Sequence, residues 1–266
     1  MDDRQADGVR QAVREAYADV ATQEGSCCCE RAASCCPDTS AADQRSAQLG
    51  YSADELAAVP DGANLGLGCG NPTAIAALRP GEVVLDLGSG GGLDCFLAAR
   101  QVGESGRVIG VDMTPEMVSR ARENARQGGY ANVEFRLGEI EHLPVADASV
   151  DVVLSNCVIN LSPDKPSVYR EAFRALKPGG RLAVSDVVAT APLPDEMRQD
   201  RALLCGCVAG AMIVADLADL LREVGFGEIA IHTKEESRAF IREWAPGRQI
   251  EQYIVSADIE AMKPES

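Results

Sequence analysis

The chain has 266 residues, 41 acidic and 25 basic, and a formal net charge of −16 at pH 7. Binding to DNA or RNA is not expected, because affinity for phosphate backbones comes from clustered Lys and Arg. No segment approaches the roughly 18 apolar residues that a membrane-spanning helix needs, and the first residues lack the pattern of a signal peptide. We therefore expect a cytoplasmic protein with no nucleic-acid or membrane partner.

The first predicted element is a short amphipathic helix over residues 9–21, where apolar side chains recur at helical spacing. Residues 22–46 follow as a predicted loop, which contains five of the ten cysteines. In a reducing compartment, free thiols, metal or metalloid ligands and redox catalysis are the explanations for such cysteines. A zinc finger has poor support, because the chain has two histidines and no Cys-x-x-Cys.

From residue 82 onward, short β-rich runs alternate with longer helical ones. This alternation indicates βαβ units and a mainly parallel sheet covered on both faces, an α/β Rossmann-like fold. The predicted strands cover residues 83–87, 108–112, 133–137, 150–154 and 181–188, and the helices cover 93–102, 115–127 and 166–176.

The tail of the chain is less regular. It offers helices at 195–204 and 215–224, a strand at 228–232 and a last apolar run at 253–259. We predict three parts: a helix and Cys-rich loop over 1–50, a cofactor-binding domain over 51–191, and a C-terminal insertion with the last strands over 192–266.

A glycine-rich turn follows the first predicted strand, in the run from Asp86 to Gly92. Glycines suit this place, because the backbone must turn sharply and approach a ligand at the carboxyl end of the strand. The dinucleotide fingerprint G-x-G-x-x-G is not matched, since Leu93 and Cys95 stand where its third glycine would be. The spacing present is D-x-G-x-G-x-G, and Asp112 closes the second strand twenty residues beyond Gly92.

This combination resembles the S-adenosylmethionine-dependent methyltransferases with a Rossmann-like sheet. The resemblance implies that the methionine part of the cofactor lies along the loop and that Asp112 accepts hydrogen bonds from both ribose hydroxyls. A nicotinamide-binding domain, or a glycine turn without function, is the alternative. The predicted cofactor-binding residues are Asp86, Gly88, Ser89, Gly90, Asp112, Met113, Glu139, Ile140, Glu141 and Asn156.

Three cysteines lie in notable surroundings. Cys157 comes just after the fourth strand, so its sulfur should border the cofactor crevice. Cys69 and Cys207 stand among glycines, which suggests tight bends that aim a small side chain. Spacing alone does not show that residues so far apart meet.

Four stretches of the chain look like the arsenite methyltransferases, at residues 64–72, 83–92, 155–165 and 206–211. The resemblance covers about residues 50–215. It implies that Cys69, Cys157 and Cys207 bind arsenic and act in catalysis. Family members also use an N-terminal cysteine, for which we choose Cys29 from the crowded run at 27–29.

The chemistry agrees with this resemblance, because trivalent arsenic is soft and thiolates suit soft centres. Arsenic held by three sulfurs keeps a lone pair that can attack the sulfonium methyl group at a near-attack distance of about 3–3.5 Å. No general base is needed. The resemblance further implies that a cysteine pair then forms a disulfide, and that a thiol reductant, glutathione or thioredoxin, resets the protein. The expected partners are arsenite, methylated arsenicals and this reductant.

Two other functions stay open at this stage. A C-methyltransferase of a quinone-like ring resembles the chain at residues 176–180, and a non-catalytic protein could sequester arsenite through its thiols. Cys95 is expected to pack in the hydrophobic core. Cys205 is either a packing residue or an auxiliary thiol.

Overall fold

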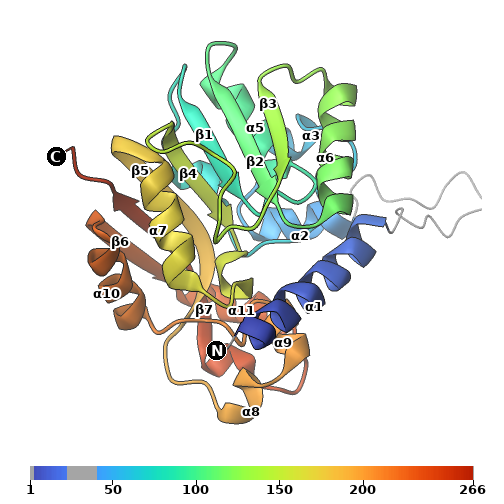
Figure 1. Ribbon diagram of the computed structural model, residues 1–266. Coiled ribbons are helices and arrows are strands. Elements are labelled where there is room, and N and C mark those ends of the chain that lie inside the picture. Colours follow the sequence, from blue (N-terminus) through green and yellow to red (C-terminus); the bar gives the residue numbers. More distant parts are fainter. Residues whose placement is uncertain (1–2, 23–40, 266) are drawn as a thin grey trace, which may run out of the picture.

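Seven strands form one sheet in the computed structural model, which describes residues 3–22 and 41–265 (Figure 1). Their order across the sheet is β3-β2-β1-β4-β5-β7-β6. Strands β1 to β5 pair in parallel, and β7 runs antiparallel to both β5 and β6. The strands are β1 Val83–Leu87, β2 Arg107–Asp112, β3 Val133–Leu137, β4 Val150–Asn156, β5 Leu176–Ala189, β6 Gly227–Lys234 and β7 Ile254–Met262. The predicted Rossmann-like, mainly parallel fold is confirmed.

Helices precede and separate these strands. The α-helices are α1 Asp3–Thr22, α2 Ala41–Gln48, α3 Ala53–Ala57, α4 Pro72–Ile75, α5 Leu93–Val102, α6 Pro115–Gly128, α7 Lys165–Ala175, α8 Asp195–Arg198, α9 Arg201–Cys205, α10 Val214–Val224 and α11 Arg238–Ile241. Three short 3-10 turns are η1 Ile159–Leu161, η2 Glu235–Ser237 and η3 Ile250–Gln252.

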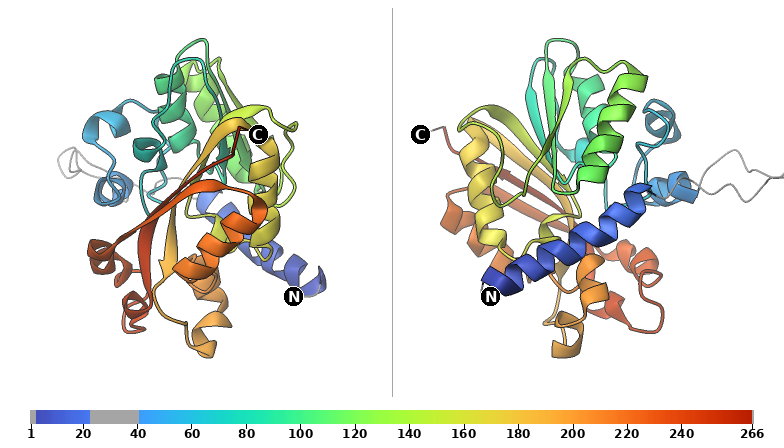
Figure 2. Two further views of the ribbon diagram at one scale, coloured as in Figure 1. Left: turned by 90° about the vertical axis from the view of Figure 1, so that its left-hand side faces the viewer. Right: turned by 45° about the vertical axis from the view of Figure 1, so that its right-hand side comes forward.

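Two hydrophobic layers hold the helices to the sheet, because successive strand residues point to opposite faces. On one face, Val84 and Val152 pack with Phe96 of α5 and Val118 of α6. On the other face, Leu85 and its neighbours pack with apolar residues of α7 and α10. Figure 2 shows α5 on one side of the sheet and α7 and α10 on the other.

The structure corrects several of the predicted elements. Helix α1 begins at Asp3 and not at residue 9, and β5 begins at Leu176 and not at residue 181. The helix expected over 195–204 is divided into α8 and α9, because Asp200 adopts an extended conformation and its carboxylate accepts the backbone N–H groups of Ala202 and Leu203. The loop expected over 22–46 is wrong for residues 41–46, which belong to α2. Residues 23–40 lie outside the described part of the chain.

Helix α1 crosses the end of the sheet at which the parallel strands finish (Figures 1 and 2). At this end the chain order reverses between β1 and β4, the place where open α/β sheets bind ligands. Strands β6 and β7 extend the same sheet as β1 to β5, and the proposed division at residues 50 and 191 stays a prediction. Within the described residues, no helix is long and apolar enough to cross a membrane.

Candidate active site

The glycine loop joins β1 to α5 and requires glycine at several of its positions. Gly88, Gly90 and Gly92 have φ angles of 69°, 51° and 97°, a left-handed region that other residues rarely adopt. A Cβ atom on Gly91 would lie 2.7 Å from the carbonyl oxygen of Ala63. At these four glycine positions the loop backbone can therefore take this path only without a side chain.

Asp112 ends β2 and lies against the loop. Its carboxylate accepts the N–H of Gly90 at 2.9 Å and the N–H of Thr114 at 2.9 Å. These bonds fix the side chain at the carboxyl end of the strand. Burial raises the pKa of Asp112, and the two backbone donors oppose that effect.

A cavity of about 670 Å³ opens between the glycine loop, α1 and the C-terminal half of the chain. Nine of the ten predicted cofactor-binding residues line it: Asp86, Gly88, Ser89, Gly90, Asp112, Met113, Ile140, Glu141 and Asn156. The carboxylate of Glu139 instead forms ion pairs with Arg10 at 3.5 Å and Arg14 at 3.3 Å. Direct contact of each of these residues with the cofactor stays a prediction.

Helix α1 supplies one wall of this cavity through Arg10, Val13 and Tyr17. The hydroxyl of Tyr17 donates to the carbonyl oxygen of Cys205 at 3.4 Å, and Arg14 donates to that of Met113 at 3.2 Å. The helix thus connects the predicted cofactor side of the cavity with the segment that carries Cys205.

A second buried carboxylate, Asp94, lies in the first turn of α5 and also lines the cavity. It accepts the hydroxyl of Tyr51 at 2.6 Å and the amide Nδ2 of Asn156 at 3.2 Å. Burial raises the pKa of Asp94 to about 6, and burial together with Asp94 raises that of Asp86. The sequence prediction missed Asp94 and Tyr51, although the place of Asp94 directly after the glycine loop was an available signal.

Asn156 connects this carboxylate to the first of the predicted arsenic ligands. Its Oδ1 accepts the backbone N–H of Cys69 at 3.1 Å, while its Nδ2 donates to the hydroxyl of Tyr51 and to the carbonyl oxygen of Gly70 at 2.9 Å each. The side chain at the end of β4 therefore orders the loop that carries Cys69.

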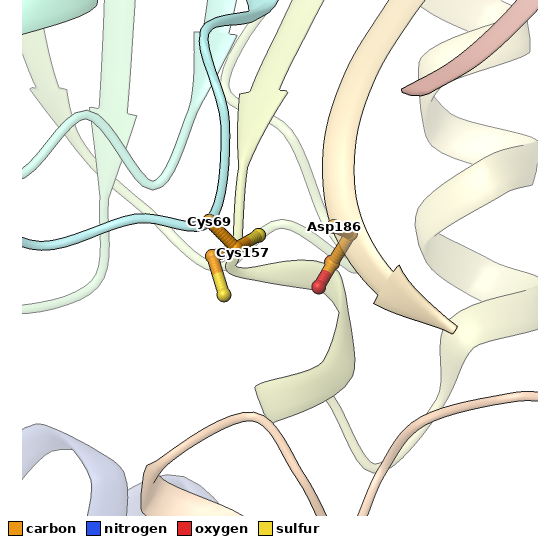
Figure 3. Close-up of side chains that lie close together, drawn as sticks. All are labelled: Cys69, Cys157 and Asp186. Carbon is orange, nitrogen blue, oxygen red and sulfur yellow. The ribbon is translucent and has the colours of Figure 1, made fainter. Parts of the chain in front are cut away.

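Two of the three predicted arsenic ligands have their sulfurs close together, and the third, Cys207, contacts the backbone of Cys157. The sulfurs of Cys69 and Cys157 and a carboxylate oxygen of Asp186 all lie within 4.8 Å of one another (Figure 3). The thiol of Cys207 donates to the carbonyl oxygen of Cys157 at 2.7 Å, and that of Cys69 donates to the carbonyl oxygen of Ser185 at 3.3 Å. Cys157 and Cys207 line the cavity, and Cys69 is buried behind them.

Two of these cysteines have a strained backbone. Cys157 and Cys207 have φ angles of 55° and 63°, which are uncommon for residues other than glycine. Backbone hydrogen bonds from their N–H groups hold them there, to Ser185 at 2.8 Å and to Leu204 at 3.0 Å. Strain of this kind is found where the surrounding structure fixes a side chain for function.

The environment raises the pKa of all three thiols and so favours their protonated form. Burial raises the pKa of Cys69 to about 12. The pKa of Cys157 is lowered by its hydrogen bond with Cys207, but the hydrogen bond with Cys69 and burial outweigh that effect and raise the pKa well above its usual range. The hydrogen bond with Cys157, together with burial, likewise raises the pKa of Cys207 well above its usual range. Arsenous acid can exchange with such thiols without releasing net protons, because each hydroxide that leaves arsenic takes one thiol proton and departs as water.

The other cysteines are distributed as follows. Cys95 is fully buried in the layer beneath the sheet, as expected for a core residue, and its thiol donates to Asp86 at 3.1 Å. Cys205 is partly buried and lines the cavity. The N-terminal cysteines, Cys29 among them, lie outside the described residues, so the choice of Cys29 stays a prediction.

Comparisons with known proteins agree with this geometry. Residues 78–240 match the family model of a methyltransferase domain. An arsenite methyltransferase from Halobacterium salinarum is 56% identical over 98% of this chain and 68% of its own length. This chain belongs to the arsenite methyltransferase family. The human arsenite methyltransferase is 44% identical, over 54% of this chain and 40% of its own length.

A solved structure supports the same assignment. The arsenic(III) S-adenosylmethionine methyltransferase from Chlamydomonas reinhardtii is 37% identical and superimposes with a TM-score of 0.61, over 83% of this chain and 72% of that one. As a member of this family, the chain is an S-adenosylmethionine-dependent methyltransferase that acts on arsenic. It spans 68% of the archaeal relative and less than half of the human one.

Proposed function

We propose that Cys69, Cys157 and Cys207 hold trivalent arsenic at one side of the cavity, and that the glycine loop holds S-adenosylmethionine at the other. The observation that carries this proposal is that the sulfurs of Cys69 and Cys157 lie within 4.8 Å of each other beside the cavity, and that the thiol of Cys207 reaches the backbone carbonyl oxygen of Cys157 at 2.7 Å. Coordination would replace the hydrogen bond from Cys207 to Cys157, because a coordinated sulfur has no proton to donate.

The cavity suits the charge of this cofactor. S-adenosylmethionine carries a positive amino group and supplies, when bound, a methyl group on a sulfonium sulfur. Asp86, Asp94 and Asp112 place carboxylates along the cavity wall, and Asp112 would accept hydrogen bonds from the ribose hydroxyls. The expected role of these residues is to bind and orient the cofactor, so that its methyl group faces the thiols.

The protein's part in the chemistry is to position arsenic and to leave its lone pair free. Three thiolates form a pyramid around trivalent arsenic, and the lone pair takes the methyl group as the carbon–sulfonium bond breaks. The electron pair of that bond stays on sulfur. Arsenic is formally oxidised by two electrons, and two thiols return them by forming a disulfide. A reductant such as glutathione or thioredoxin would then restore the thiols, which fits a cytoplasmic location.

Replacement of single cysteines tests this proposal. Cys157→Ser and Cys207→Ser should each lower arsenite affinity by at least about 100-fold, a loss of about 2.7 kcal/mol, and abolish the appearance of methylated arsenic. Calorimetry should show S-adenosylmethionine affinity within about twofold of the wild type, because the glycine loop and Asp112 are unchanged.

Cys205→Ser is the matched control, since Cys205 lies on the same segment as Cys207. It should retain arsenite binding. Undiminished arsenite methylation in the Cys157 and Cys207 variants would refute the assignment. A protein that only sequesters arsenite would bind it and yield no methylated species with cofactor and reductant present.

A further inference from the structure

Asp186 has a feature that arsenic binding does not explain. The residue is 3% exposed and lies in β5. Its Oδ1 accepts the backbone N–H of Val187 at 2.8 Å and the Nδ2 of Asn160 at 2.9 Å. Its Oδ2 has no hydrogen-bond partner among the described residues. A buried carboxylate oxygen without a donor is costly, so this atom is available to accept a hydrogen bond or to bind a cation.

The neighbours of this carboxylate are two thiols. The sulfurs of Cys69 and Cys157 lie within 4.8 Å of a carboxylate oxygen of Asp186 and of each other (Figure 3). They come from the loop before α4 and from the residue that follows β4, while Asp186 comes from the neighbouring strand β5. Folding thus joins two soft ligands and one hard ligand, whereas trivalent arsenic prefers three sulfurs.

We propose that Cys69, Cys157 and Asp186 form a Zn²⁺ site, which overlaps the arsenic site and inhibits methyl transfer when it is occupied. Zn²⁺ binds cysteine sulfur at about 2.3 Å and carboxylate oxygen at about 2.0–2.2 Å with tetrahedral geometry, which places ligand atoms roughly 3.6–3.8 Å apart. The three atoms need to approach by only a small distance. The fourth position remains for water.

Charge and supporting hydrogen bonds favour this ligand set. Two thiolates and one carboxylate around Zn²⁺ carry one excess negative charge, after both thiol protons pass to solvent. Lys165 exerts a favourable electrostatic effect on ionised Asp186, and Lys234 does so on Cys69. Asn160 and Val187 hold the Oδ1 of Asp186, as outer partners hold metal-ligating carboxylates. Mg²⁺ and Ca²⁺ are disfavoured, because they prefer sets of oxygen ligands.

The two ligand sets share Cys69 and Cys157 but differ in the third member. In the proposed arsenic site, Cys207 is the third ligand. Its thiol donates a hydrogen bond to the carbonyl oxygen of Cys157 and is not part of the cluster that contains Asp186. Replacement of Asp186 and replacement of Cys207 should therefore have opposite effects on Zn²⁺ and arsenite.

The experiment uses the reduced full-length chain with Cys27, Cys28, Cys29, Cys35 and Cys36 replaced by Ser, which removes other thiols that could bind Zn²⁺. Competition with a chromophoric chelator measures Zn²⁺ affinity, and calorimetry measures arsenite affinity. Asp186→Asn should weaken Zn²⁺ binding by more than about 10-fold and arsenite binding by less than about threefold. Cys207→Ser should weaken arsenite binding by at least about 100-fold and Zn²⁺ binding by less than about threefold.

Two further measurements keep the proposal testable if Asp186→Asn folds poorly. Co²⁺ bound to the parent protein should give thiolate-to-metal charge-transfer absorption equal to two thiolates. In the wild-type chain, Zn²⁺ should inhibit arsenite methylation competitively with arsenite. The proposal fails if the parent protein does not bind one Zn²⁺ ion per chain, or if the Co²⁺ absorption corresponds to three thiolates. It also fails if Cys207→Ser weakens Zn²⁺ binding and arsenite binding equally. Failure of these tests leaves the arsenite assignment intact.

Discussion

At the scale of single residues, Gly210 has the tightest place on the segment that carries Cys207. A Cβ atom there would overlap the carbonyl oxygen of Asn160 in η1. The backbone after Cys207 therefore packs directly against the turn that follows Cys157. This close approach explains why glycine stands there, and it places two of the thiols next to each other.

Gly210→Ala should move the Cys207 segment away from η1. We expect the free energy of unfolding to fall by about 1–3 kcal/mol through overpacking, and arsenite affinity to fall by more than S-adenosylmethionine affinity. Gly206→Ala is the control on the same segment, because its Cβ would lie 3.5 Å from the carbonyl oxygen of Ala202, an ordinary contact. Chemical denaturation and calorimetry measure both quantities; equal effects of the two changes would contradict this reasoning.

Single residues also show which parts of the candidate site could be predicted from the sequence and which could not. The glycine loop and Asp112 were predictable, because strand–loop–helix context and spacing carry the signal. Cys69, Cys157 and Cys207 were found by resemblance, and only folding places their side chains together. Asp186 was missed, because an acidic residue inside a strand pattern has no local mark of a functional role. Its unpartnered oxygen is visible only in three dimensions.

At the scale of elements, the first turn of α5 carries a buried carboxylate whose ionisation costs stability. Asp94 has a pKa of about 6 in the folded chain, against about 3.8 when unfolded, mainly because of burial. A carboxyl group with a raised folded pKa favours the folded state below pH 3.8, and this contribution is lost as pH rises through 6. The difference corresponds to roughly 3 kcal/mol.

Between pH 4 and pH 7, the free energy of unfolding of the wild type should therefore fall relative to that of Asp94→Asn. Asparagine loses the hydrogen bond from Asn156 at every pH, so the slope with pH and not the absolute stability is the readout. Urea denaturation at several pH values measures it. Parallel slopes for the two proteins would show that Asp94 does not titrate in this range.

Prediction of elements succeeded where local signals and packing agree. Strand β1 and helix α5 have the predicted bounds, because a buried apolar run or a glycine boundary defines their ends. Strand β3 also has the predicted bounds and is followed by Gly138, although only Phe135 in it is buried. The division into α8 and α9 was missed, since apolar spacing continues through Asp200 although its side chain caps a new helix. The place of β7 between β5 and β6 depends on long-range pairing that no local pattern records.

At the scale of the whole molecule, the net charge of −16 implies repulsion between like charges in the compact state. Added salt screens such repulsion, with a Debye length of about 30 Å at 0.01 M and 3 Å at 1 M. The Tm should therefore rise by several degrees between about 0.01 and 0.5 M KCl and then level off.

If screening raises the Tm, choline chloride at equal ionic strength should raise the Tm by the same amount as KCl. The variant Glu104→Gln/Glu223→Gln, which neutralises two exposed carboxylates, should depend less on salt. Scanning calorimetry measures these effects. A Tm that does not change with KCl, or that rises without levelling off, would contradict the screening explanation.

The cavity shared by the glycine loop and the thiols has a kinetic consequence. Successive transfers to one arsenic atom require the spent donor to be exchanged for a fresh one while the arsenical stays attached. If the thiols hold arsenic as proposed, the number of methyl groups added before release depends on two competing rates: exchange of the spent nucleoside and dissociation of the arsenical from the thiols. A higher concentration of S-adenosylmethionine should shift the product mixture toward more highly methylated arsenic species, although the thiols themselves are unchanged.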